Sequence, residues 1–213
     1  MKYALAFLTA AFFSSVGVVQ AAEQNPEALV KQVTEEILQA LKTDKKLAAG
    51  DKQRALQIAE EKVLPHIDFE EATRLAVGRA WSQASPEQKK QLTTEFRRML
   101  VRIYSNAIQP YEGQVITVSP VRMKPGDTDV TVHNTFKRSS GGKPVGFDYA
   151  MRKTEQGWKI YDIVVEGVSL VLTYRSEFDG VVRQQGVDGL IKALAAKNAP
   201  AAAVGGSASK SGK

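Results

Sequence analysis

The stretch that decides the fold is residues 158–178, WKIYDIVVEGVSLVLTYRSEF. Two apolar runs, DIVV and VSLVL, are joined by Glu166 and Gly167, and the whole stretch is too short and too interrupted to cross a membrane. We interpret the pair as a corner: a strand ends near Glu166, Gly167 permits the bend, and Ser169 caps a helix that runs through Tyr174. We expect a salt bridge to hold the Glu166 carboxylate at this corner. The stretch therefore predicts two elements that fold back over one shared apolar interior.

Strands precede this stretch along the chain. The segments QVITVSPV, DVTVHNTF and PVGFDYAM, residues 114–121, 129–136 and 144–151, follow a period of two. Turn-like connections, SSGGK and EQG, follow the second and third of them. Together with the strand that begins near Trp158, they predict four sequential antiparallel strands, a meander over about residues 113–166.

The chain before the strands, about residues 25–111, has the pattern of helices throughout. Asn25 followed by Pro26 marks the start of a first helix. A second helix is expected from Asp51 until just before Pro65, and a third over residues 68–78.

The longest predicted helix begins after Ser85 and ends at Pro110. Ser85 and Gln88 fit a capping box, with Pro86 between them at the first helical position. Helix returns after the strands, over about residues 169–197. Helices packed on one side of an antiparallel sheet define the α+β fold class, which we predict here.

The first 21 residues have the pattern of a cleaved signal peptide. Lys2 precedes the apolar run of residues 4–13, and VQA ends at Ala21 with small residues where a signal peptidase reads. A single domain, residues 22–198, and a low-complexity tail, residues 199–213, are expected to follow, the tail being disordered. Because the chain has no cysteine, it is expected to be exported without disulfides or a lipoprotein anchor.

Few residues carry the chemistry of an enzyme site. The sequence contains no G-x-S-x-G elbow, P-loop or H-E-x-x-H motif, and the lack of cysteine excludes thiol nucleophiles and zinc–cysteine sites. Its two histidines, His66 and His133, are interpreted as structural or exposed. Asp148 and Tyr149 could be imagined as an acid–base pair, but neighbours in a strand point to opposite faces. No catalytic residue, metal site or cofactor is therefore predicted.

The charge balance is mildly basic. The 29 Lys and Arg residues outnumber the 23 Asp and Glu residues, for a net charge of +6. Export argues against nucleic acid as a partner, whereas attraction to anionic membrane surfaces and an ordinary solvated surface both account for the excess.

Two long motifs resemble those of a known family. Residues 65–96, PHIDFEEATRLAVGRAWSQASPEQKKQLTTEF, are similar to the P-x-x-D-F … G-x-x-W-x-x-A-S-x-x-Q signature of the MlaC family, the periplasmic phospholipid-binding or toluene-tolerance proteins. The matching residues are Pro65, Asp68, Phe69, Gly78, Trp81, Ala84, Ser85 and Gln88. The stretch at 158–178 resembles the second signature of the family through Trp158, Asp162, Glu166, Gly167, Val168, Ser169, Leu170, Tyr174, Arg175 and Phe178. The resemblance spans about residues 25–195, and only the Ala/Gly/Ser tail departs from it.

This resemblance implies an NTF2-like or cystatin-like antiparallel sheet with a helical subdomain, the two enclosing an apolar pocket. It implies a periplasmic carrier that shuttles glycerophospholipids between an outer-membrane lipoprotein complex and an inner-membrane ABC transporter with an MCE-domain ring, and so maintains outer-membrane lipid asymmetry. Phospholipid is then cargo rather than a cofactor, no enzymatic activity is expected, and the protein is expected to be a monomer. A periplasmic chaperone or adaptor with an apolar groove is the alternative.

The hypothesis for the acyl pocket joins the apolar face of the predicted sheet to the long helix. Its predicted lipid-binding residues are Phe96, Leu100, Tyr104, Phe147, Tyr149, Met151, Val164, Val168, Leu170, Val171 and Tyr174. Arg97, Arg98 and Arg102 on the same helix are predicted to dock acidic partner surfaces or headgroups. An ordinary closed core is the commoner explanation for each apolar residue taken alone, and a solvated helix face explains the arginines almost as well. The sequence leaves these alternatives open.

Overall fold

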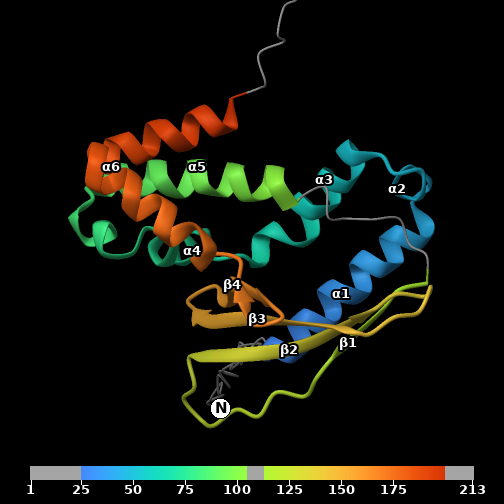
Figure 1. Cartoon of the computed structure of the whole chain (residues 1–213). Helices are drawn as coiled ribbons and strands as arrows, with labels where there is room; N and C mark the ends of the chain where they lie inside the picture. Colours follow the sequence, from blue (N-terminus) through green and yellow to red (C-terminus); the bar gives the residue numbers. More distant parts are fainter. Residues whose placement is uncertain (1–24, 105–112, 200–213) are drawn as a thin grey trace, which may run out of the picture.

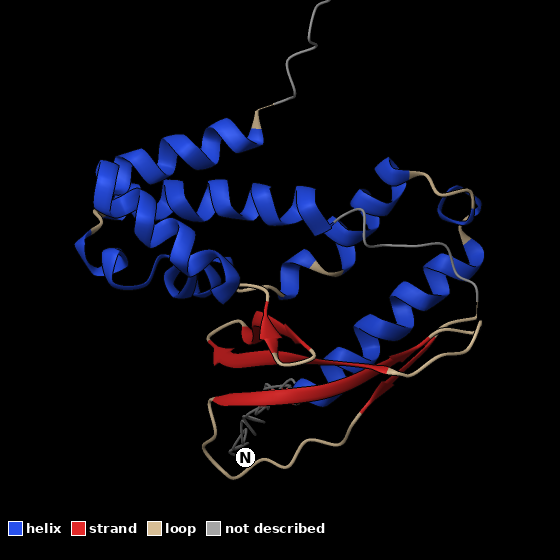
Figure 2. Cartoon of the chain, in the orientation of Figure 1, coloured by secondary structure: helices blue, strands red, loops and turns tan. Residues whose placement is uncertain are grey.

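The computed structural model describes residues 25–104 and 113–199 as an antiparallel sheet with one helix packed on it and a layer of helices beside it (Figure 1). In chain order the elements are α1 Pro26–Thr43, α2 Lys45–Ala48, α3 Lys52–Lys62, η1 Leu64–His66, α4 Phe69–Val77, η2 Gly78–Gln83, α5 Pro86–Tyr104, β1 Val115–Val118, β2 Asp129–Lys137, β3 Val145–Thr154, β4 Gly157–Val165, β5 Val168–Ser169, η4 Leu172–Tyr174 and α6 Arg175–Asn198. Helices stand at both ends of this chain and the strands lie between them (Figure 2). The predicted signal peptide, nearly all of the predicted tail and the predicted end of the long helix lie outside the described residues.

Two helices begin at the caps that the sequence predicts. The Asn25 side chain accepts a hydrogen bond from the Ala28 N–H, and Pro26 occupies the first turn of α1. At the start of α5, the Ser85 hydroxyl accepts from the Gln88 N–H at 3.2 Å, and Gln88 Oε1 accepts from the Ser85 N–H at 2.9 Å. Both predicted caps are confirmed.

The second predicted helix is shorter than expected. Asp51 caps α3 by accepting from two backbone N–H groups, but α3 ends at Lys62 and a 3₁₀ turn, η1, follows it. Asp68 then caps α4, which stops where Gly78 takes a positive φ of 66°. The short chain between α3 and α4 is thus folded into the 3₁₀ turn η1. It lies against the sheet, where Ile67 forms a backbone bridge with Ile160 of β4.

The sheet is a meander in which each strand pairs with its neighbour in sequence, in the order β1-β2-β3-β4-β5. The predicted α+β class with an antiparallel meander is confirmed. Val132, Met151 and Ile160 are buried on the face that α1 covers. A β-bulge interrupts the pairing of β3 with β4: Ala150 pairs with Asp162 and Met151 pairs with Ile160.

The corner at Glu166 and Gly167 is a two-residue hairpin turn rather than a bend from strand to helix. Both residues have positive φ, 48° and 84°, as tight turns between right-twisted antiparallel strands require. Val165 consequently pairs with Val168, and β5 is a short fifth strand that the sequence prediction missed. The Ser169 hydroxyl accepts a hydrogen bond from the N–H of Leu172, the first residue of the 3₁₀ turn η4, whose N-cap is Val171, and α6 begins after η4. The Glu166 side chain is exposed and forms no ion pair with any described residue, so the predicted salt bridge is not found there.

Three apolar clusters hold the layers together. The largest lies between α4, α5 and α6, the second lies between α1 and the sheet, and the third joins α1, α2 and α3. Representative buried members of the three are Leu92, Phe96 and Phe178, then Leu29, Val132 and Trp158, then Leu47, Ala55 and Ile58. The helical cluster and the sheet cluster are separate, and space remains between them.

Helix α6 bends sharply at Gly186, whose φ of 70° lies outside the helical region. Its first half starts next to the sheet, and its second half runs along α5 (Figure 1). Among the described helices, none combines the length and the apolar character that a bilayer crossing requires.

Candidate functional site

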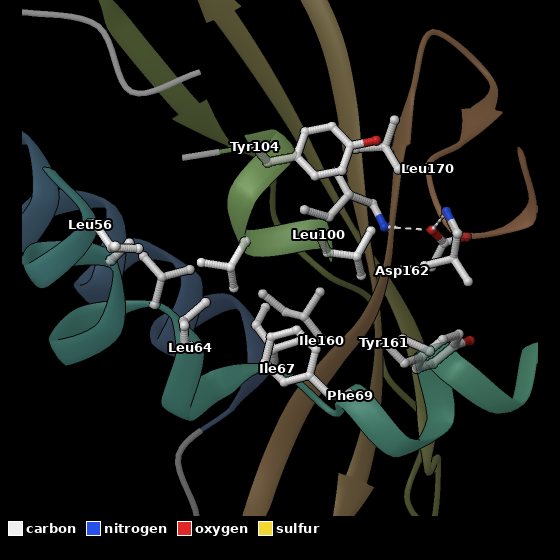
Figure 3. A pocket seen from close by; sticks show the side chains of 16 residues that line it. Leu56, Leu64, Ile67, Phe69, Leu100, Tyr104, Ile160, Tyr161, Asp162 and Leu170 are labelled. Atoms are coloured by element: carbon white, nitrogen blue, oxygen red, sulfur yellow. Dashed lines mark hydrogen bonds between the residues drawn. The ribbon is translucent and has the colours of Figure 1, made fainter. Parts of the chain in front are cut away.

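An apolar cavity of about 250 Å³ lies between α3, η1, α4 and α5 on one side and β4 and the segment that follows β5 on the other (Figure 3). It is lined by Leu56, Ala59, Val63, Leu64, Ile67, Phe69, Ala72, Leu100, Val101, Tyr104, Ile160, Tyr161, Asp162, Ile163, Leu170 and Val171. In Figure 3, Leu56 and Leu64 lie on the side opposite Asp162 and Leu170. Most of these side chains are purely hydrocarbon, and such a lining favours an apolar ligand.

Local structure explains how each wall is built. Leu56, Ala59 and Val63 follow one another at spacings of three and four, so they share one face of the helix end. On the opposite wall, all four residues from Ile160 to Ile163 border the cavity, which a regular strand could not achieve. The bulge explains this, because it leaves the residue between Ile160 and Asp162 without a partner on β3 and re-aims the strand.

Asp162 is the one acidic residue among those lining residues, and it is only 7% exposed. Its Oδ1 accepts from the Ile163 N–H at 2.8 Å and from the Val171 N–H at 3.2 Å, and its Oδ2 accepts from the Ser169 hydroxyl at 2.5 Å. Three hydrogen bonds compensate for the hydration that this carboxylate loses. The protein itself therefore satisfies the carboxylate, and a ligand cation is not needed.

Tyr104 stands at the edge of the cavity, at the end of the described part of α5. Burial raises the pKa of the Tyr104 hydroxyl to about 12, and a hydrogen bond with Tyr174 adds to this effect. The side chain is therefore neutral at physiological pH. It offers an apolar ring to the cavity and a polar tip at the rim.

A second cavity of about 170 Å³ lies between α1 and the inner face of the sheet. It is lined by Leu29, Val30, Val33, Thr34, Ile37, Val63, His66, Ile67, Ile116, Tyr149, Ile160 and Ile163. Val63, Ile67, Ile160 and Ile163 line both cavities, so these four side chains form a common wall.

The titratable groups of the second cavity are neutral at physiological pH. Burial raises the pKa of Tyr149 to about 12. Burial also lowers the pKa of His66, and the positive charge of Lys159 lowers it further. The two cavities together thus form a space that is almost entirely uncharged.

Five of the predicted lipid-binding residues line these cavities. Leu100, Tyr104, Leu170 and Val171 line the first, and Tyr149 lines the second. Phe96, Phe147, Met151, Val164, Val168 and Tyr174 line neither of the two.

The residues outside the cavities have other structural roles. Phe96 packs edge-on against Tyr174 and Phe178, with ring centroids 5.4 and 5.3 Å apart, so it belongs to the helical core. Met151 is fully buried in the cluster under α1. Val168 is 55% exposed because the hairpin turn carries it to the surface.

The wall formed by α3, η1 and the start of α4 was missed by sequence reasoning. It contributes Leu56, Ala59, Val63, Leu64 and Ile67, and no residue before Phe96 was predicted to bind lipid. The helical spacing of the first three was a usable signal. It identifies an apolar face, although it does not say what lies against that face.

The three predicted docking arginines are exposed on α5. Arg98 pairs with Glu95 at 2.9 Å, and the Arg97 guanidinium lies over the ring of Phe69, 5.4 Å from its centroid. Phe69 lines the first cavity, so Arg97 stands directly outside its wall. The docking role of Arg97, Arg98 and Arg102 stays a prediction.

The two residues considered as an acid–base pair, Asp148 and Tyr149, lie on opposite faces of the sheet. Asp148 pairs with His133 at 2.9 Å on the outer face of the sheet, where the His133 side chain is 64% exposed. Tyr149 is on the inner face, so Asp148 and Tyr149 do not converge. Within residues 25–104 and 113–199, no group of three or more His, Cys, Asp or Glu side chains could hold a metal ion.

Known proteins are similar to this chain in sequence and in structure. A crystal structure described as the phospholipid-binding protein from Ralstonia solanacearum in complex with a phospholipid superposes with a TM-score of 0.72 at 37% identity, covering 81% of this chain and 96% of that one. The chain is 23% identical over 189 residues to the intermembrane phospholipid transport system binding protein MlaC of Haemophilus influenzae, covering 88% of this chain and 87% of the relative. It is 24% identical over 189 residues to the toluene tolerance protein ttg2D of Pseudomonas putida, covering 88% and 85%.

The profile of the MlaC protein family matches residues 31–196, which include all residues that line the two cavities except Leu29 and Val30. The motifs at residues 65–96 and 158–178 lie inside this match. The chain therefore belongs to the MlaC family.

Proposed function

We propose that this protein is a phospholipid carrier and that its cargo binds in the two adjoining cavities. The observation that carries the proposal is their common wall: Val63, Ile67, Ile160 and Ile163 separate the two spaces by single side chains. Small movements of these side chains join the cavities into one apolar chamber. Their volumes, about 250 and about 170 Å³, together fall within the range of about 300–1,000 Å³ that is typical of ligand pockets.

The energetics of acyl chains favour a carrier that holds its cargo until it docks. An acyl chain of ~16 carbons costs on the order of 13 kcal/mol to expose to water, at ~0.8 kcal/mol per methylene. Release into free solution is therefore slow, and transfer requires an apolar surface that receives the chains. The name of the Haemophilus relative and the phospholipid bound by the similar Ralstonia protein support the same cargo.

The cellular setting is the finer part of the proposal. The carrier works in the periplasm after signal-peptide cleavage, as a monomer. It exchanges glycerophospholipids with an outer-membrane lipoprotein complex and an inner-membrane MCE-domain ABC transporter, and thereby maintains lipid asymmetry of the outer membrane. The name of the Haemophilus relative, a binding protein of an intermembrane phospholipid transport system, supports this setting.

Organic extraction of the purified protein, followed by mass spectrometry, tests the proposal. Leu170→Trp places a larger side chain in the first cavity, and we expect it to remove most of the co-purifying phospholipid. Val115→Trp is the control: Val115 is 55% exposed and lines neither cavity, so lipid content should match that of the unmodified protein. An unmodified protein that carries no phospholipid would contradict the carrier function and favour the chaperone or adaptor alternative.

A further inference from the structure

One short segment forms the outer wall of the first cavity. Residues 168–172, here called the strap, run from β5 into η4, and they point Leu170 and Val171 into the cavity. The outer side of the strap is exposed, since Val168 is 55% and Leu172 is 43% accessible to solvent. The strap is therefore the layer of chain that separates this part of the cavity from water.

The pairing of backbone strands holds the strap only weakly. β5 contributes two residue pairs to the sheet, Val165 with Val168 and Val164 with Ser169. Beyond these two pairs, the Leu170 N–H donates to the Ile163 carbonyl at 2.8 Å. This is the last backbone hydrogen bond between the strap and β4. So short a strand has little stability of its own.

Val171 is buried in the helical core at one end of the strap, and a side chain of β4 supplies a further attachment around Leu170. The Asp162 carboxylate accepts from the Ser169 hydroxyl at 2.5 Å and from the Val171 N–H at 3.2 Å, so it grips the strap at two points around Leu170. The Ser169 oxygen in turn accepts from the Leu172 N–H at 2.9 Å, which extends the network to the end of the strap. Hydrogen bonds to a charged acceptor are stronger than neutral ones, particularly where water is excluded.

We propose that Asp162 is a positioning residue that latches the strap against β4 through Ser169 and so sets the rate at which lipid leaves the first cavity. The inference rests on the proposed carrier function. When the latch is released, the strap moves away from β4 at Ser169 and Leu170 while Val171 stays packed in the helical core, and the cavity opens between β4 and the end of α5. Asp162 acts through the strap and needs no contact with the cargo.

Transfer kinetics test the latch. Protein loaded with a phosphatidylethanolamine that bears a fluorescent acyl chain is mixed with vesicles of equimolar phosphatidylethanolamine and phosphatidylglycerol that contain a quenching lipid. Ser169→Ala removes the hydroxyl from the Asp162 network, and we expect transfer to be about tenfold faster or more, the equivalent of about 1.4 kcal/mol. Ser169→Thr keeps a hydroxyl and should restore the slow rate.

A remote hydroxyl provides the matched control. Thr154 Oγ1 donates to the Gly157 carbonyl and accepts from the Gln156 N–H, the same number of hydrogen bonds as Ser169 Oγ, but in the turn between β3 and β4. Thr154→Ala should therefore transfer lipid at the unmodified rate. Hydrogen exchange adds a structural measure: the Val171 N–H keeps its Asp162 acceptor in Ser169→Ala, so it loses protection only if the strap separates from β4.

The outcomes separate the latch from the carrier function. Equal transfer rates for Ser169→Ala and the unmodified protein, with lipid bound in both, overturn the latch and leave the carrier function standing. Unmodified protein that takes up no labelled lipid overturns both. If Ser169→Ala does not fold, Asp162→Asn, which keeps the side-chain volume but removes the charged acceptor, takes its place; an unchanged rate in that variant also overturns the latch.

Discussion

Replacing Ile67 with alanine tests whether the two cavities act as one binding site. Ile67 belongs to the wall that both cavities share. Its three outer carbons contribute about 0.8 kcal/mol each through burial, and the space that they leave adds to the cost, so lipid-free protein should lose about 2–4 kcal/mol of unfolding free energy. In the loaded protein an acyl chain fills that space, and we expect a loss smaller by about 1.4 kcal/mol. By linkage, this difference corresponds to about tenfold tighter lipid binding.

Urea unfolding of lipid-free and lipid-loaded protein measures both losses. Trp81 lies in the helical core and Trp158 in the sheet core, so their fluorescence reports on both layers. Ile58→Ala is the control, because Ile58 is 6% exposed, sits in the third cluster and lines neither cavity; it should cost the same with and without lipid. If Ile67→Ala also costs the same in both forms, the cargo does not reach the common wall and our account of the site is wrong.

The hairpin turn, one helix cap and two tyrosines provide further tests. Glu166→Asn should raise the unfolding free energy by about 0.5–1 kcal/mol because asparagine tolerates the positive φ of 48°, and Gly167→Ala should lower it by about 1 kcal/mol or more at φ 84°; thermal unfolding that shows no difference between the two would contradict this. Ser85→Ala should cost about 1 kcal/mol through loss of the capping box, measured by urea unfolding, and an unchanged midpoint would count against the cap. Tyr104 and Tyr149 have pKa values of about 12 in the folded protein against an ordinary 10.0, so folding favours their protonated forms: this contribution to stability is complete below pH 10 and is lost as the pH rises from 10 to 12. An absorbance titration of the phenolates should show both ionising late, and Tyr149→Phe should reduce the late change in absorbance by the contribution of one tyrosine.

The starts of helices could be predicted because their signals are local. Asn25 with Pro26, and Ser85 with Gln88, need only their own neighbours to form a cap. The hairpin turn gave no comparable signal, because a two-residue turn with positive φ usually contains Asn-Gly or Asp-Gly rather than Glu-Gly. Glu166 takes that conformation because the sheet pairs Val165 with Val168 across it.

The site was harder to predict than the fold, because periodicity identifies a face and not its neighbour. Phe96 and Leu100 lie one turn apart on the same face of α5, yet Phe96 packs into the helical core and Leu100 lines the first cavity. Phe96 lies where α6 covers α5, and Leu100 lies beyond that contact. The extent of this contact depends on tertiary packing and is not encoded in the helical periodicity. Tyr161 borders the cavity through a bulge, and a bulge changes the period that the prediction relied on.

The first cavity is built from parts of the chain that are far apart in sequence and are therefore synthesised at different times. Its walls combine α3, η1 and α4 from near the beginning of the chain with β4 and the strap from near its end. Such non-local contacts form late in folding, since a long loop must close before they stabilise anything. A chain that lacks its last third therefore has no enclosed space for acyl chains. If lipid binds in this cavity, only the completely folded molecule can hold it. Lipid binding then also measures the fraction of protein that has folded completely.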